Sequence, residues 1–196
     1  TLQLDSADDA SDSIVFGAAS TIRNLVVTGT FSGTVPFSNP SDYAVTFTTL
    51  NQAAGTIDGS AQSNWSIQNL TLSGGSFTPA TTVSTTGFGG TYNVDTTVTF
   101  NNLTSSYFGG WGMTIGGGDT LVVTGTLTLT DGFVNTGTID AEGDINQAST
   151  FDGGTTTINF ANAGAQTYTL NGGISPTLQL DSADDASDSI VFGAAS

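Results

Sequence analysis

The sequence predicts an all-β protein, and three observations lead to this prediction. Residues that favour strands (Thr, Val, Ile, Phe) alternate with residues that favour turns (Gly, Asn, Asp), while helix formers are scarce: no Lys, one Met and one Glu. Apolar residues recur at every second position, the period of a half-buried strand. A segment of twenty residues occurs twice without a change, which is typical of repeat proteins. We predict a parallel β-helix, or β-solenoid, with coils of variable length.

The period of two is clearest in residues 121–129, LVVTGTLTL. Leu121, Val123, Leu127 and Leu129 point to one side of such a strand, and the threonines point to the other. Residues 24–31 and 139–145 show the same alternation, and we predict each of these three segments to be one strand. Further strands are predicted at 44–49, 66–73, 94–100, 155–160, 167–170 and 177–180, with Gly-, Asn- and Asp-rich turns between them.

The repeated segment defines the domain organisation. Residues 1–20 and 177–196 both read TLQLDSADDASDSIVFGAAS, so that Thr177 corresponds to Thr1. We therefore interpret 1–176 as one complete tandem unit and 177–196 as the start of the next, identical unit. Shorter echoes share no common period, so the coils must differ in length. With about 20–25 residues per coil, a unit of roughly 7–9 coils would rise about 35–45 Å at about 4.8 Å per strand.

An alternative fold is an array of β-sandwich domains, two to each unit. The two halves of the unit would then resemble each other. The phrase LVVTGT occurs at 25–30 and 121–126, and GTID at 55–58 and 137–140, but their offsets differ and so do their neighbours. This favours the solenoid. A third possibility is a subunit that polymerises by exchanging a terminal strand, with the duplicated segment as an overlap.

Charge and composition limit the partners. The chain carries a net charge of −16, with Arg23 as its single basic side chain and no His or Cys. One base does not neutralise a phosphate backbone, so we expect no nucleic-acid binding. No apolar run of about 18 residues is present, so we expect no membrane insertion. Without cysteine the fold has no disulfides.

The densest group of acids lies in the repeated segment, as DSADDASD. Calcium prefers six to eight oxygen ligands, and four carboxylates within eight residues make it the one cofactor that we consider. The spacing lacks the pattern of known calcium loops, and a solvated acidic loop that keeps a fibre soluble is the other interpretation. The candidate metal residues are Asp5, Asp8, Asp9, Asp12, Asp181, Asp184, Asp185 and Asp188.

Other candidate sites are few. Asp140, Glu142 and Asp144 are predicted on one face of a strand, where a solvated surface, calcium or a partner would each suit them. Nucleophilic catalysis lacks its His and Cys, and hydrolysis by two carboxylates would lack supporting bases, so we expect no enzyme. The aromatic residues of 107–111 lie among glycines, which predicts an irregular loop, a cap on the core or a sugar-stacking patch.

Residues 123–173 string TGTLT, NTGTI and GAQTYT phrases between short apolar strands. In this they resemble large bacterial β-solenoid surface proteins, the filamentous-haemagglutinin-like and autotransporter-like repeat adhesins. The resemblance implies a right-handed β-helix that is exported, and it carries over no site residues. It leads us to expect a structural repeat of a long extracellular fibre or cell-surface filament, whose main partner is further copies of itself. The alternative is a repetitive adhesin stalk or binding module that contacts glycans or host surfaces.

Overall fold

The computed structural model describes residues 1–5, 14–38, 43–95, 97–162, 164–180 and 189–192 of the chain. Over these residues the secondary structure consists of strands without a helix, and every strand pair is parallel. The strands stack into about eight coils, which confirms the predicted β-solenoid. The sandwich alternative is wrong, because sandwich sheets are antiparallel. In the described part of the chain no helix is long and apolar enough to cross a membrane.

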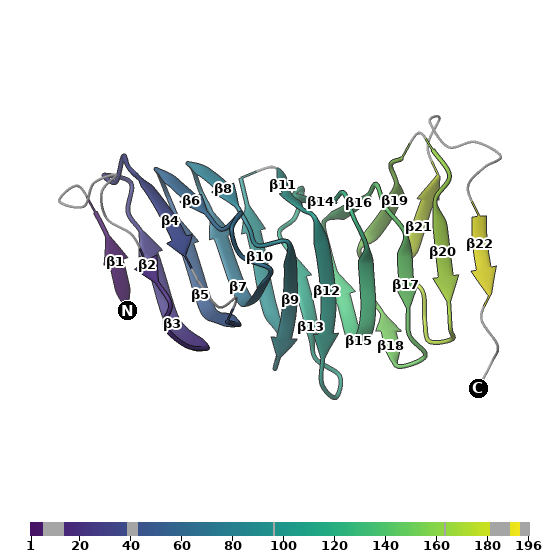
Figure 1. Ribbon diagram of the computed structural model, residues 1–196. Coiled ribbons are helices and arrows are strands. Elements are labelled where there is room, and N and C mark those ends of the chain that lie inside the picture. Colours follow the sequence, from purple (N-terminus) through teal and green to yellow (C-terminus); the bar gives the residue numbers. More distant parts are fainter. Residues whose placement is uncertain (6–13, 39–42, 96, 163, 181–188, 193–196) are drawn as a thin grey trace.

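One long sheet, which we call the main sheet, runs the length of the molecule (Figure 1). In several of its coils two short strands take the place of one long strand. Its thirteen strands are β1 (Leu2–Leu4), β3 (Ser20–Val27), β5 (Val45–Gln52), β7 (Asn64–Leu72), β9 (Thr82–Gly87), β10 (Gly90–Val94), β12 (Asn102–Tyr107), β13 (Gly112–Ile115), β15 (Leu127–Asn135), β17 (Ile145–Gln147), β18 (Phe151–Gly153), β20 (Thr167–Leu170) and β22 (Ser189–Phe192).

Two shorter sheets follow one another along the opposite side of the solenoid (Figure 1). The four-stranded sheet comprises β2 (Ile14–Val15), β4 (Thr34–Ser38), β6 (Thr56–Asp58) and β8 (Ser76–Thr78). The five-stranded sheet comprises β11 (Thr97–Phe100), β14 (Thr120–Val123), β16 (Thr138–Ala141), β19 (Thr157–Phe160) and β21 (Thr177–Leu180). No ladder joins β8 to β11 in the described structure, and we call this break the seam.

The coils differ in length, as predicted, and the range is slightly wider than expected. Thr120 pairs with Thr138, eighteen residues further on, whereas Ser20 pairs with Val45, twenty-five residues further on. The additional residues lie in turns and at a β-bulge in β15, so the ladders stay aligned while the connections vary.

A single apolar core fills the space between the sheets. Near the N-terminal end aromatic side chains of the core form a stack, in which the ring centroid of Trp65 lies 5.2 Å from those of Phe37 and Phe47, edge to face. Such ring pairs add about 0.5–1.5 kcal/mol each beyond the apolar area they bury. The alternation read from the sequence is therefore the alternation of side chains toward and away from this core.

Four strands predicted as continuous end or turn at corners instead. Residues 121–129 divide into β14 and β15, residues 139–145 divide into β16 and β17, and residues 24–31 end as strand at Val27. Residues 94–100 divide between β10, which ends at Val94, and β11. The first two corners stack: a Cβ on Gly143 would lie 1.9 Å from the carbonyl oxygen of Gly125 in the neighbouring coil. Only glycine allows two corners to approach so closely.

Candidate functional site

The acidic segment lies almost wholly outside the described residues. Asp5 follows β1 and is half-buried, and the other predicted calcium ligands (Asp8, Asp9, Asp12, Asp181, Asp184, Asp185 and Asp188) fall outside the described ranges. Where the chain is described, no group of three or more acidic side chains is arranged to hold a metal ion. Calcium binding by the acidic segment therefore stays a prediction.

The prediction that the second acidic group shares one face of a single strand is wrong. Asp140 lies in β16, whereas Glu142 and Asp144 lie in the corner that follows it. The Asp140 carboxylate accepts a hydrogen bond from the Asn159 amide (3.3 Å), and that of Asp144 accepts one from the Thr167 backbone N–H (3.0 Å). Two of these three acids thus join neighbouring coils instead of forming one acidic row.

The two copies of the repeated segment occupy different sheets. In the first copy, β1 pairs with β3 of the main sheet, and β2 belongs to the four-stranded sheet. In the second copy, the residues identical to β1 form β21 of the five-stranded sheet, and Ser189–Phe192 join the main sheet as β22. The second copy therefore adds a further coil to the preceding solenoid.

An aligned row of threonines, which the sequence reasoning missed, marks the five-stranded sheet. Each of its strands begins with Thr followed by a buried or partly buried apolar residue, and the threonines are in register from coil to coil. The four-stranded sheet has the same pattern in Thr34, Thr56 and Ser76. The signal was present as a Thr-apolar pair, but the pair recurs at an irregular spacing that hides it in the sequence. The row comprises Thr97, Thr120, Thr138, Thr157 and Thr177.

Buried glutamines, also missed, bind the carbonyls of neighbouring coils. The Gln147 amide donates to the carbonyl of Gly172 (2.8 Å), and its oxygen accepts from the hydroxyl of Tyr168. The Gln62 amide donates to the carbonyl of Phe37 (3.1 Å), one coil away. Two short sequence motifs contain these glutamines: NQA, at 51–53 and 146–148, and AQ before Ser or Thr, at 61–63 and 165–167. These glutamines satisfy carbonyls that a corner would otherwise bury without a partner.

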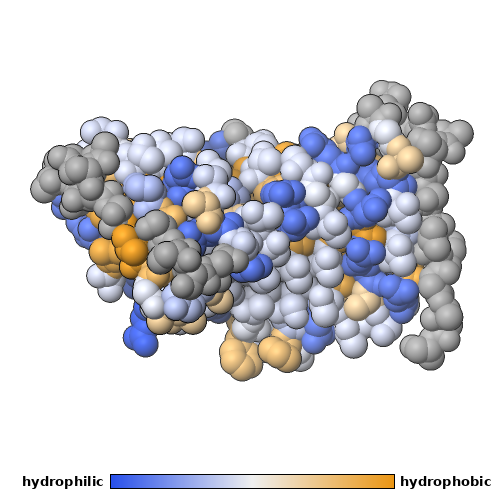
Figure 2. Space-filling view, in the orientation of Figure 1, coloured by the Kyte–Doolittle hydropathy of each residue, from blue (hydrophilic) through white to orange (hydrophobic). Residues whose placement is uncertain are grey.

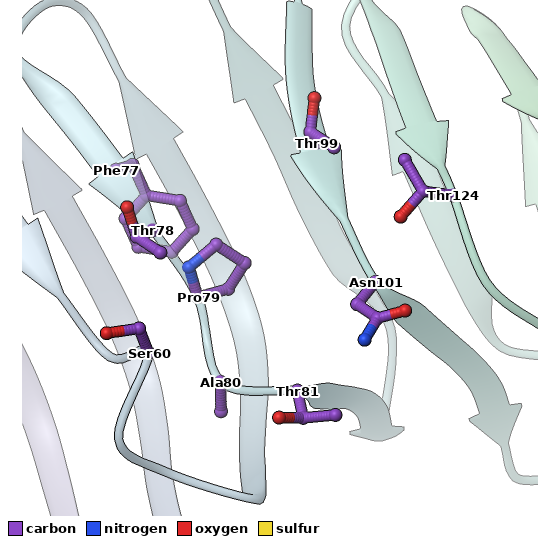
Figure 3. A pocket seen from close by; sticks show the side chains of 9 residues that line it. All are labelled: Ser60, Phe77, Thr78, Pro79, Ala80, Thr81, Thr99, Asn101 and Thr124. Carbon is purple, nitrogen blue, oxygen red and sulfur yellow. The ribbon is translucent and has the colours of Figure 1, made fainter.

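A shallow pocket of about 380 Å³ lies at the seam (Figure 3). Pro79 follows β8 there and has no N–H to donate, so the ladder does not continue on that side. Thr99, Asn101 and Thr124 line the opposite wall. Phe77 forms the floor and packs on Trp65, with ring centroids 6.2 Å apart. The pocket lies at the break between the two sheets, and no charged side chain lines it.

The predicted aromatic patch divides into a buried and an exposed part. Tyr107 ends β12 with its ring wholly buried, and burial raises the pKa of its hydroxyl to about 12. Phe108 and Trp111 are 66% and 51% exposed, and Phe88 of the preceding coil is 73% exposed. Trp111 and Phe88 flank a groove of about 560 Å³ on the main sheet. The sequence alone did not indicate Phe88, because it lies beside Trp111 only when the two coils stack in the solenoid.

Comparison with known protein families, with curated proteins and with solved structures finds no match to this chain. The geometry alone defines its class, a parallel β-solenoid whose described residues bring together coil-to-coil ladders, amide networks and two uncharged pockets.

Proposed function

We propose that this chain is a structural repeat of a long extracellular or cell-surface fibre, in which solenoid units stack end to end on further copies of themselves. One observation carries the proposal: the second copy of the repeated segment stacks in register on the unit that precedes it, through β21 on β19 and β22 on β20. A β-solenoid exposes unpaired strand edges at its ends, and a following unit would cover them. The negative charge would keep such a fibre soluble.

In a tandem array every copy of the segment has the same neighbours and should adopt one placement. We favour the placement of the second copy, because it extends the row of threonines. Thr1 would then begin the row, and the steps from Thr1 through Thr34 to Thr177 would number eight, of which the first would span 33 residues and form the longest coil. At about 4.8 Å per step, each unit would add about 38 Å to the fibre.

The experiment is electron cryo-microscopy of a chain of three units, read for axial length and continuity. We expect an unbroken rod that lengthens by about 38 Å with each unit. Separate beads, or a break at each boundary, would refute the proposal. Leu178→Asp at the internal boundaries should interrupt the rod, since Leu178 packs against the core. Gln179→Asp is the matched control, because Gln179 lies on the outward side of the same strand and is more exposed.

A cross-link provides a second, independent test. Asn159 and Gln179 are register partners in adjacent coils, about 4.8 Å apart, a separation that a disulfide spans. The chain contains no other cysteine, so a bond between Asn159→Cys and Gln179→Cys is unambiguous. We expect it to form at every boundary of the three-unit chain. If it does not form while the rod persists, the units join through a different register.

Adhesion is the second candidate function, and the exposed aromatic residues favour it. The resemblance of residues 123–173 to bacterial surface adhesins supports export and a role at the cell surface. In this proposal the solenoid is a stalk, has no enzymatic activity, and binds neither nucleic acid nor membranes. Labelling of intact cells with an antibody against the chain would test the location, and labelling only after cell lysis would contradict it.

A further inference from the structure

We propose that the groove beside Trp111 on the main sheet binds a neutral oligosaccharide that runs along the stacking axis. The groove crosses the coils that contain β7, β10, β13 and β15. Its wall is aromatic and its floor is a row of uncharged polar side chains. This inference goes beyond the proposed fibre, since a passive fibre needs no such site.

The aromatic wall is exposed and preformed. The rings of Phe88 and Trp111 lie edge to face, with centroids 6.4 Å apart. Figure 2 shows exposed hydrophobic surface at the lower edge of this view, where the β9–β10 and β12–β13 turns, which contain Phe88 and Phe108, lie in Figure 1. Exposed large aromatics that the core does not use mark a surface for interaction. The flat face of a sugar ring, which carries C–H groups, suits such a wall.

Backbone contacts hold Trp111 and its neighbouring turn in place. The carbonyl of Trp111 accepts a hydrogen bond from the N–H of Phe133 in the next coil (3.3 Å). On the other side, the Gln68 amide donates to the carbonyl of Gly89 (2.9 Å), which fixes the turn next to Phe88. A site fixed before binding loses less conformational entropy when a ligand binds.

The floor offers hydrogen-bonding groups in a line. Thr91, Thr114 and Asn135 are successive register partners, and Asn69 precedes them, with its oxygen accepting the N–H of Thr91 (3.1 Å). The spacing between them is about 4.8 Å. Hydroxyl and amide groups both donate and accept, as do sugar hydroxyls. An aromatic wall with a few convergent polar groups is the usual composition of a small-molecule site.

Charge selects a neutral ligand. No charged side chain lines the groove, and the whole chain has a net charge of −16. An acidic polysaccharide would be repelled over the whole surface without a local base to compensate. A protein partner would be expected to cover the projecting rings with an apolar surface and would leave the polar row of the floor unused, so we favour the sugar.

The test measures binding of cellohexaose, laminarihexaose, chitohexaose and mannohexaose to the chain by titration calorimetry, with polygalacturonate as the acidic comparison. We expect at least one neutral probe to bind and polygalacturonate not to bind. Trp111→Ala should weaken binding at least about tenfold, as expected for the loss of an aromatic anchor. Phe108→Ala is the matched control, because Phe108 is also exposed but does not line the groove. It should leave the affinity unchanged.

Three outcomes would overturn the proposal. They are the absence of binding by every neutral probe, an equal loss of affinity in both variants, and preferential binding of polygalacturonate. Self-association of the chain that Trp111→Ala abolishes, without sugar binding, would assign the groove to a second copy instead. Circular dichroism of both variants verifies that the solenoid is intact, and Asn135→Ala, which alters the floor but not the wall, should weaken the same probe.

Discussion

The stacked corners lead to our most specific prediction, the substitution Gly143→Ala. The new Cβ would lie 1.9 Å from the oxygen and 2.6 Å from the carbon of the Gly125 carbonyl, and both belong to backbone that has no rotamer to change. Relieving the contact requires the two coils to separate by about 1 Å or more at this corner, to reach ordinary van der Waals distance. Two ladder bonds flank it, from Glu142 N–H to the Val123 carbonyl (2.9 Å) and from Leu127 N–H to the Asp144 carbonyl (3.0 Å). A separation of that size breaks both.

Overpacking costs about 1–3 kcal/mol, and each lost ladder bond costs about 1 kcal/mol. We therefore expect Gly143→Ala to lower the free energy of unfolding by about 3–5 kcal/mol, and the melting temperature by roughly 6–20 °C for a chain of this size. Chemical unfolding and thermal melts followed by circular dichroism measure both. Gly117→Ala is the control, since a Cβ there meets no atom within 4 Å. Equal stability of the two variants would refute the close stacking of the corners.

Three further predictions concern the core. Trp65→Ala should cost about 3–5 kcal/mol in urea unfolding, whereas Trp111→Ala, at an exposed position, should cost less than about 1 kcal/mol; similar losses would contradict the assigned burial. Gln147→Leu leaves the Gly172 carbonyl without its partner and the Tyr168 hydroxyl with only Ser175, and it should cost about 2 kcal/mol, while Gln179→Leu, on the outward side of its strand, should be neutral in the same assay. Burial raises the pKa of Tyr107 to about 12, above its unfolded value of about 10. The neutral hydroxyl therefore contributes fully to the free energy of unfolding below about pH 10, and about 3 kcal/mol of that free energy is lost as the pH rises to about 12. An unfolding midpoint that stays constant between about pH 9 and 12 would contradict this.

The sequence predicts strands well where turn residues bracket them, and less well at corners. Thr167–Leu170 and Thr177–Leu180 have the predicted bounds, since glycines or proline separate them from their neighbours. The alternation joins residues 121–129 into one predicted strand because it continues unbroken through the corner at Gly125. Both sheets enclose the same core, so every second residue points toward the core before the corner and continues to do so after it. The alternation therefore predicts which side chains are buried, but it does not predict where the chain turns from one sheet to the next.

Contacts between coils were the least predictable part of the candidate sites. Phe88 and Trp111 are separated by a full coil, and the spacing between coils varies too much to be read from one sequence. The buried glutamines are similar: their short phrases are visible, but the carbonyls they bind lie about a coil away. Long-range pairs of this kind depend on the number of residues in each turn, which local preference does not fix.

The repeated segment shows the same limit in its strongest form. The residues TLQL form β1 in the main sheet and β21 in the five-stranded sheet, so one sequence fits two sheets within one molecule. Each sheet requires an apolar side chain at every second position, and the segment meets that requirement in either place. The neighbour must therefore decide: β19 offers four register partners to β21, and β3 offers three to β1. In a tandem array every copy of the segment would follow a strand equivalent to β19. A multi-unit chain must therefore test which sheet the TLQL segment joins at each unit boundary, because the segment forms a strand in either sheet.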